Sequence, residues 1–152
     1  MPLLIVLAPL LAGGGTMLAD RYRPKLRNIF VIAGTVIPLL LVALMYPAVV
    51  RGSFYYLYLN ILPPVGMEFR VDLLSFYMAL LFTFFGLIVA VYTLGYYRDK
   101  EEGRIFFYFL MPAFAGCFGV VLSGNMLTFF LYFELMSLMF FPLVSRAIPI
   151  SM

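Results

Sequence analysis

Long apolar stretches separated by short polar ones dominate the pattern of this chain. Five of these stretches are close to the roughly 20 residues that a helix needs to cross a hydrocarbon core about 30 Å thick. They cover residues 3–19, 29–50, 73–97, 105–123 and 126–145. The pattern therefore predicts an all-α integral membrane protein with five transmembrane helices, forming a single membrane domain over residues 1–152.

The longest polar interval lies between the second and third stretches and has a pattern of its own. Two short segments rich in aromatic and aliphatic residues, 54–60 and 67–71, flank Pro63 and Pro64. Such segments around a proline turn predict a short β-hairpin at the membrane surface. The alternative is an aromatic belt segment without fixed structure.

Composition supports a membrane protein and excludes other classes. Hydrophobic residues make up 65% of the chain and charged residues 11%, against about 45–50% and about 25% in typical soluble domains. So few charges exclude a soluble globular enzyme, and so much apolar surface excludes a disordered chain. The chain has no histidine and a single cysteine, so neither an internal disulfide nor a cysteine-based metal site is expected.

The basic residues divide unequally between the two sides that alternating helices would create. Eight fall after the first stretch, after the third, and after the fifth: Arg21, Arg23, Lys25, Arg27, Arg98, Lys100, Arg104 and Arg146. The other side holds only Arg51 and Arg70. Because basic residues favour the cytoplasmic side, we expect the N-terminus and the hairpin outside and the C-terminus inside.

Glu134 is the one acidic residue that falls well inside an apolar stretch. It lies nine residues after Asn125 and twelve before Arg146, about 13 Å along a helix and so near the bilayer centre. An ionisable group at that depth costs at least a few kcal/mol unless it carries a proton or is paired with a cation. On a helix, its only polar neighbour would be Ser137, so we expect Glu134 to hold a proton or to meet a lysine or arginine from another polypeptide. This predicts an ion-translocation site at Glu134, with Ser137 as its candidate supporting residue and a static interhelical hydrogen bond as the alternative.

The remaining polar and small residues have structural explanations. Asp72, three residues before Ser75, is expected to cap the third helix, and Asn125 to make a tight turn before the fifth. The Gly13–Gly15 run lacks the lysine of a phosphate loop and is expected to allow close helix packing. No nucleophile–base constellation, cofactor motif or metal-ligand cluster is evident in the sequence, so no enzyme active site is expected in this chain.

Two stretches of the sequence carry a family resemblance. The first is Phe-Arg-Val-Asp-Leu-Leu-Ser at residues 69–75. The second is residues 122–137, in which Glu134 stands between aromatic residues and Leu-Met-Ser. Together with the Tyr-Thr-Leu-Gly-Tyr-Tyr sequence at residues 92–97, they resemble the N-terminal part of the antiporter-like subunits. That family includes the large proton-pumping subunits of respiratory complex I, large subunits of Mrp sodium/proton antiporters, and relatives in membrane-bound hydrogenases and sulfur-reducing complexes.

The resemblance implies a partner for Glu134. In the family, the glutamate of the fifth helix faces a lysine on a later, broken helix, and Glu134 falls at that glutamate. Family members have about fourteen helices with inverted five-helix repeats, so a chain with five helices is expected to be a split subunit, a truncated paralogue or a fragment. The intramembrane lysines would then belong to a partner membrane subunit.

The function implied is proton or sodium translocation in a multisubunit complex of the plasma or inner membrane, coupled to redox chemistry in partner subunits. Redox cofactors are expected only in those partners, with none in this chain. The partners expected are the lipid bilayer and other membrane subunits, not nucleic acid.

A complex of the hydrogenase, sulfur-reductase or Mrp type is favoured over ordinary complex I, because a split large subunit suits a modular assembly. The alternative is a non-conducting structural or assembly subunit of the membrane arm.

Overall fold

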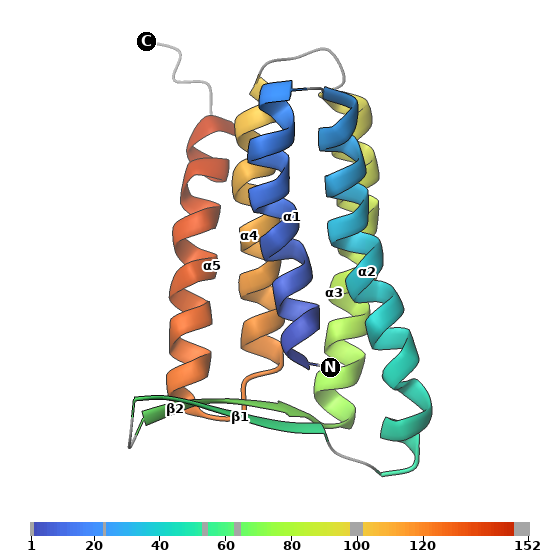
Figure 1. Ribbon diagram of the computed structural model, residues 1–152, viewed down its shortest axis with the longest axis vertical. Helices are drawn as coiled ribbons and strands as arrows, with labels where there is room; N and C mark the ends of the chain where they lie inside the picture. Colours follow the sequence, from blue (N-terminus) through green and yellow to red (C-terminus); the bar gives the residue numbers. More distant parts are fainter. Residues whose placement is uncertain (1, 23, 53–54, 63–64, 98–101, 148–152) are drawn as a thin grey trace.

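The protein folds as a bundle of helices with a small hairpin across one end. The computed structural model describes residues 2–22, 24–52, 55–62, 65–97 and 102–147. The helices run alternately toward and away from the hairpin (Figure 1). In chain order, the elements are α1 (Pro2–Tyr22), α2 (Pro24–Val50), β1 (Tyr55–Leu62), β2 (Val65–Val71), α3 (Leu73–Tyr96), α4 (Glu102–Val121) and α5 (Met126–Ala147).

The described part of the chain contains five apolar helices, as the sequence predicts, but their apolar stretches are not equally long. Four contain stretches long and apolar enough to cross a membrane: Pro2–Ala19, Leu26–Val50, Leu73–Tyr96 and Met126–Ser145. In α4 the apolar part, Ile105–Val121, is shorter and covers about 26 Å at 1.5 Å per residue. It is therefore at the lower limit of spanning length. Which end of the bundle faces the cytoplasm stays a prediction.

The predicted hairpin is confirmed, and the alternative of an unstructured aromatic segment is wrong. β1 and β2 pair antiparallel, with Leu57 opposite Phe69 and Tyr56 opposite Arg70. Because side chains alternate across a strand, one face carries the buried Phe69 and Val71, while Tyr56 and Tyr58 are exposed on the other. The hairpin therefore closes one end of the bundle with an apolar face. The predicted turn at Pro63 and Pro64 lies outside the described residues.

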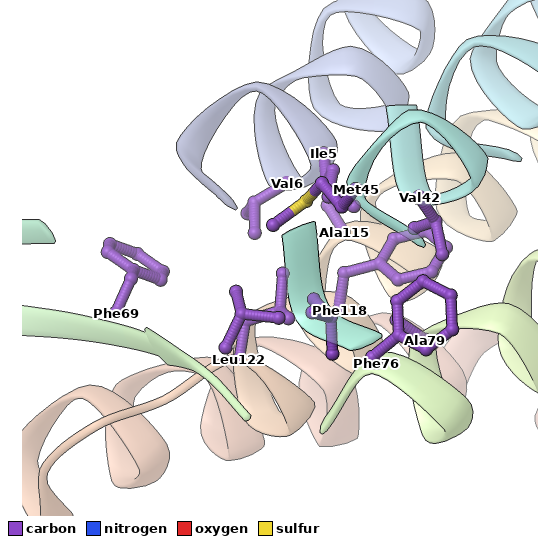
Figure 2. Packing of buried hydrophobic residues seen from close by; sticks show 12 residues of the cluster. Ile5, Val6, Val42, Met45, Phe69, Phe76, Ala79, Ala115, Phe118 and Leu122 are labelled. Atoms are coloured by element: carbon purple, nitrogen blue, oxygen red, sulfur yellow. The ribbon is translucent and has the colours of Figure 1, made fainter. Parts of the chain in front are cut away.

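Two clusters of buried side chains hold the helices together. The cluster at the hairpin end joins four helices to β2 (Figure 2) and is made of Ile5, Val6, Val42, Met45, Val49, Phe69, Val71, Phe76, Ala79, Ala115, Phe118 and Leu122. The second lies toward the other end and is made of Ala12, Val31, Ala90, Phe107, Leu110, Met111, Ala113 and Leu143. Helix α1 packs against α2 and α4, α3 packs against α2 and α4, and α5 packs mainly against α4.

Small residues allow these helices to approach one another closely. A Cβ atom on Gly34 would lie only 2.5 Å from Ala12 Cβ, and one on Gly15 would lie 2.6 Å from the Phe30 ring. A Cβ on Gly13 would lie 3.0 Å from the Pro112 ring, whereas one on Gly14 would meet nothing within 4 Å. The predicted packing role of the glycine run therefore belongs to Gly13 and Gly15.

Candidate functional site

Glu134 lies on the face of α5 that points away from the rest of the chain. The Glu134 side chain is exposed. It lies eight residues after the first residue of α5, about 12 Å along the helix. Large apolar side chains flank it on the same face, with Phe130 57%, Leu138 65% and Phe141 75% exposed. Ser137, the predicted supporting residue, is also exposed on this face. The structure therefore places a carboxyl in the middle of an uncovered apolar surface.

The packing of α5 against α4 determines which way Glu134 points. A Cβ on Gly116 of α4 would lie 2.9–3.0 Å from the backbone and Cβ of Met136, and one on Gly119 would overlap the ring of Tyr132. Tyr132 and Met136 therefore mark the face of α5 that lies against α4. Two residues along a helix correspond to a rotation of about 200°, so Glu134, midway between them, projects from the opposite face.

Glu134 has no counter-charge within the described part of the chain. None of the described residues forms an ion pair or hydrogen bond with its carboxylate. Main-chain atoms of a helix are already bonded to one another, and the neighbouring side chains on this face are mostly apolar. The geometry leaves room for a partner group only from outside these residues.

One buried cation within the bundle was not expected from the sequence. Arg27, placed in the loop before the second predicted helix, instead lies in α2 and is only 6% exposed. Its guanidinium carbon lies 5.6 Å from the centre of the Phe107 ring of α4, a distance suited to a cation–π contact. Helix α2 therefore begins at Pro24, before the apolar stretch predicted from about residue 29. The helix continues because Arg27 lies on the same buried stripe as Val31, Thr35 and Pro38.

Arg27 is not placed to neutralise Glu134. Helix α2 packs against α1, α3 and α4, and it lies at the opposite side of the bundle from α5 (Figure 1). Arg27 is near the start of α2, at the end of the bundle away from the hairpin, whereas Glu134 is in the middle part of α5. The buried cation and the mid-helix carboxyl are therefore separate features.

At the hairpin end, two polar side chains start the helices that leave it. The Asp72 carboxylate accepts a hydrogen bond from the Ser75 backbone N–H at 2.8 Å, which confirms the predicted cap of α3. This bond holds the pKa of Asp72 below its usual value, and the nearby Arg70 charge lowers it further, against the opposing effect of partial burial. Asn125, predicted to make a turn, also caps α5, because its Oδ1 accepts from the Thr128 N–H at 2.8 Å.

Metal chemistry finds no support in the described ranges. No group of three or more histidine, cysteine, aspartate or glutamate side chains within them could hold a metal ion. Cys117 is buried in α4 and is not part of a disulfide.

Residues 63–108, which include β2, α3 and the first part of α4, match the family described as NADH-Ubiquinone oxidoreductase (complex I), chain 5 N-terminus. The chain is also 37% identical over 89 residues to the A1 subunit of a Na(+)/H(+) antiporter of Staphylococcus haemolyticus (strain JCSC1435), covering 57% of this chain and 11% of that protein. It is 34% identical over 108 residues to the A/B subunit of a probable K(+)/H(+) antiporter of Rhizobium meliloti (strain 1021), covering 69% of this chain and 11% of that protein.

This chain is a relative of the antiporter-like membrane subunits. Its fold matches a chain in the structure of the membrane-bound sulfane sulfur reductase, an archaeal respiratory membrane complex, with a TM-score of 0.80 and 15% sequence identity. That match covers 91% of this chain and 28% of the other. The resemblance seen in the sequence is thus confirmed, and the chain is a multi-pass membrane protein.

The similarity has clear bounds. The chain spans about a tenth of the length of the two curated relatives named above. The family match ends at residue 108, before Glu134. The matched family region therefore does not include Glu134.

Proposed function

We propose that this chain contributes to proton or sodium translocation within a multisubunit membrane complex, and that Glu134 is its ion-responsive group. The observation that carries the proposal is the position of Glu134, a carboxyl on the uncovered face of an apolar helix, about 12 Å from the helix start. A carboxyl at this depth costs several kcal/mol in lipid and is tolerated where it has a partner or a water path.

The partner proposed for Glu134 is a membrane helix that carries a lysine. Only 11% of the stretch Met126–Ser145 is buried by the rest of the chain, so a further helix has room to pack along α5. An ammonium group on that helix would replace the lost hydration of the carboxylate. Movement of a proton or sodium ion near the pair would then change the interaction between the two charges.

The relatives support a multisubunit setting for this activity. The curated relatives are named as antiporter subunits, and the structural match comes from a respiratory membrane complex. We propose that this chain, too, works with other membrane subunits, that any redox cofactors lie in those partners, and that the end bearing most of the basic residues faces the cytoplasm.

Exchanging Glu134 for glutamine tests the proposal, because Glu134→Gln keeps the shape and removes the charge. We expect coupled ion movement to fall to background while the chain still assembles with its membrane partners. Proton movement would be followed with a pH-sensitive dye in vesicles, after a sodium pulse or after addition of the electron donor of the partner subunits. Ser137→Ala, which removes the hydroxyl of the predicted supporting residue on the same face, should lower transport less than Glu134→Gln does.

The alternative function is a non-conducting structural or assembly subunit, which the wide uncovered surface of α5 would also suit. In that case Glu134→Gln transports normally, and deletion of the chain reduces the amounts of neighbouring subunits. Normal transport by Glu134→Gln would refute the ion-responsive role.

A further inference from the structure

The free edge of β2 is covered by the connection between α4 and α5. One edge of β2 pairs with β1, and the other makes two main-chain hydrogen bonds with this connection, one as donor and one as acceptor. Arg70 N–H donates to the Leu122 carbonyl at 2.9 Å, and Gly124 N–H donates to the Glu68 carbonyl at 2.7 Å. Phe69 and Ser123 therefore form an isolated antiparallel bridge, and the connection extends the hairpin like a short third strand.

Two side chains extend these contacts into the first turn of α5. Asn125 Nδ2 donates to the Gly66 carbonyl at 2.9 Å, and the Glu68 N–H donates to Thr128 Oγ1 at 2.9 Å. The Thr128 side chain is fully buried. Because Asn125 Oδ1 also accepts from the Thr128 N–H, both residues bond the helix start and the strand together.

These contacts fix more than the start of a helix. They hold α5 at two points on one strand, Gly66 and Glu68, so the helix can neither slide along its axis nor turn about it without breaking a bond. A slip of one residue would move every side chain by about 1.5 Å and rotate it by about 100°. Helix α5 otherwise contacts the chain mainly through α4, and its opposite face is uncovered.

Glu134 lies six residues beyond Thr128, about 9 Å along the same rigid helix. We propose that Asn125 and Thr128 are positioning residues, which hold Glu134 at a fixed depth and direction by fastening α5 to β2. The effect on transport rests on the proposed function of Glu134, whereas the effect on the position of α5 does not.

Variants of Asn125 and Thr128 can remove the hydrogen bonds to β2 while leaving the size of the side chain nearly unchanged. Thr128→Val keeps the shape of threonine and removes the acceptor, whereas Thr128→Ser keeps the acceptor. Asn125→Asp keeps the cap of α5 but removes the donor to Gly66, whereas Asn125→Ala removes both. Thr83→Val is the outside control, since Thr83 is equally buried but donates only to Leu80 of its own helix.

The position of α5 would be measured in the full chain, purified with its membrane partners and reconstituted into lipid. Spin labels at Ser145→Cys, near the end of α5, and at Tyr92→Cys of α3, both exposed positions, would report the distance between the two helices in a Cys117→Ala background. We expect Thr128→Val and Asn125→Asp to shift or broaden this distance distribution by on the order of 1.5 Å, one residue of helical rise. Thr128→Ser and Thr83→Val should match the parent, and an unchanged distribution in both Thr128→Val and Asn125→Asp would overturn the proposal.

Transport supplies a second measurement, the half-saturating sodium concentration. A loss of folded protein alone would not change this concentration. After a sodium pulse, we expect Thr128→Val to change the half-saturating sodium concentration by severalfold, and Thr128→Ser to restore it. Fewer assembled complexes would lower only the maximal rate. If Glu134→Gln abolishes transport but Thr128→Val leaves the half-saturating concentration unchanged, the link between the hairpin bonds and Glu134 is wrong. If Glu134→Gln is silent, the proposed function fails, and the distance measurement still decides the position of α5.

Discussion

Helices α1 and α5 are similar in length and apolar character, yet the chain surrounds them very differently. In α1, 44% of the residues in the membrane-length stretch Pro2–Ala19 are buried, whereas in α5 only 11% of those in Met126–Ser145 are buried. Helix α1 packs between α2 and α4, while α5 packs mainly against α4 and meets β2 at its first turn. The chain thus completes the surroundings of α1 and leaves one long face of α5 uncovered.

The polar residues of the two helices follow the same division. Thr16 of α1 is fully buried, and its hydroxyl donates to the Gly13 carbonyl at 2.7 Å, so its polarity is satisfied within its own helix. Glu134 of α5 projects from the uncovered face and has no such partner among the described residues. The chain therefore satisfies the polarity of Thr16 by itself, whereas the described residues provide no such bond for Glu134.

The largest difference between the two helices is expected in the free energy of unfolding, when a large side chain at each helix is shortened to alanine. Met111 of α4 is fully buried beneath α1, so Met111→Ala should lower the free energy of unfolding by about 2–5 kcal/mol through lost contacts and a cavity. Leu138 of α5 is 65% exposed, and Leu138→Ala should change it by less than about 0.5 kcal/mol. Reversible unfolding in mixed micelles, followed by circular dichroism, would measure both.

The same Leu138→Ala variant should matter in the assembled complex. We expect it to reduce the amount of partner subunits that purify with the chain, because it removes contact area from the uncovered face. Equal losses of unfolding free energy in Met111→Ala and Leu138→Ala would contradict the contrast between the two helices.

A smaller effect is expected where glycine allows α4 and α5 to touch. A Cβ on Gly116 would crowd the backbone of Met136, which no change of rotamer can relieve, so Gly116→Ala should cost about 1–3 kcal/mol. Gly14 of α1 is the matched site, since a Cβ there meets nothing within 4 Å. Gly14→Ala should be neutral or stabilising by up to about 1 kcal/mol. If thermal unfolding finds the two alanine variants equally stable, the α4–α5 seam is looser than described.

The features predicted correctly from the sequence depend on neighbouring residues. The helices follow from apolar runs, the hairpin from alternation around a turn, and the Asp72 cap from its spacing to Ser75. Glu134 could be singled out because it interrupts an otherwise apolar run. Each of these signals lies within a window of about twenty residues.

The features that were missed depend on the rotation of a helix or on distant pairing. The charge of Arg27 predicts a loop residue, although Arg27 continues the buried stripe of Val31, Pro38 and Val42 at helical spacing. The bonds from Asn125 and Thr128 join positions 59 and 60 residues away in the chain. A single sequence shows that Asn125 suits a turn, but it does not show which strand edge that turn will meet.

The smallest expected effect distinguishes the start of α3 from the start of α5. Asp72 caps α3 with a carboxylate, whereas Asn125 caps α5 with an uncharged amide. Asp72→Ala should cost about 1 kcal/mol at neutral pH, while Asp72→Asn keeps an acceptor and should cost less. Unfolding of the variants in mixed micelles would measure this order.

The carboxylate cap should also make the start of α3 sensitive to pH. The Ser75 N–H bond holds the pKa of Asp72 in the folded chain below that of the unfolded chain. The resulting stabilisation is therefore complete above the unfolded pKa of about 4 and is lost as the pH falls through the lower folded pKa. The stability difference between the parent chain and Asp72→Asn should accordingly shrink between about pH 5 and pH 2, whereas the difference between the parent and Asn125→Ala should stay constant, because an amide does not titrate. A difference between the parent and Asp72→Asn that is independent of pH would show that the Ser75 bond does not favour the charged form of Asp72.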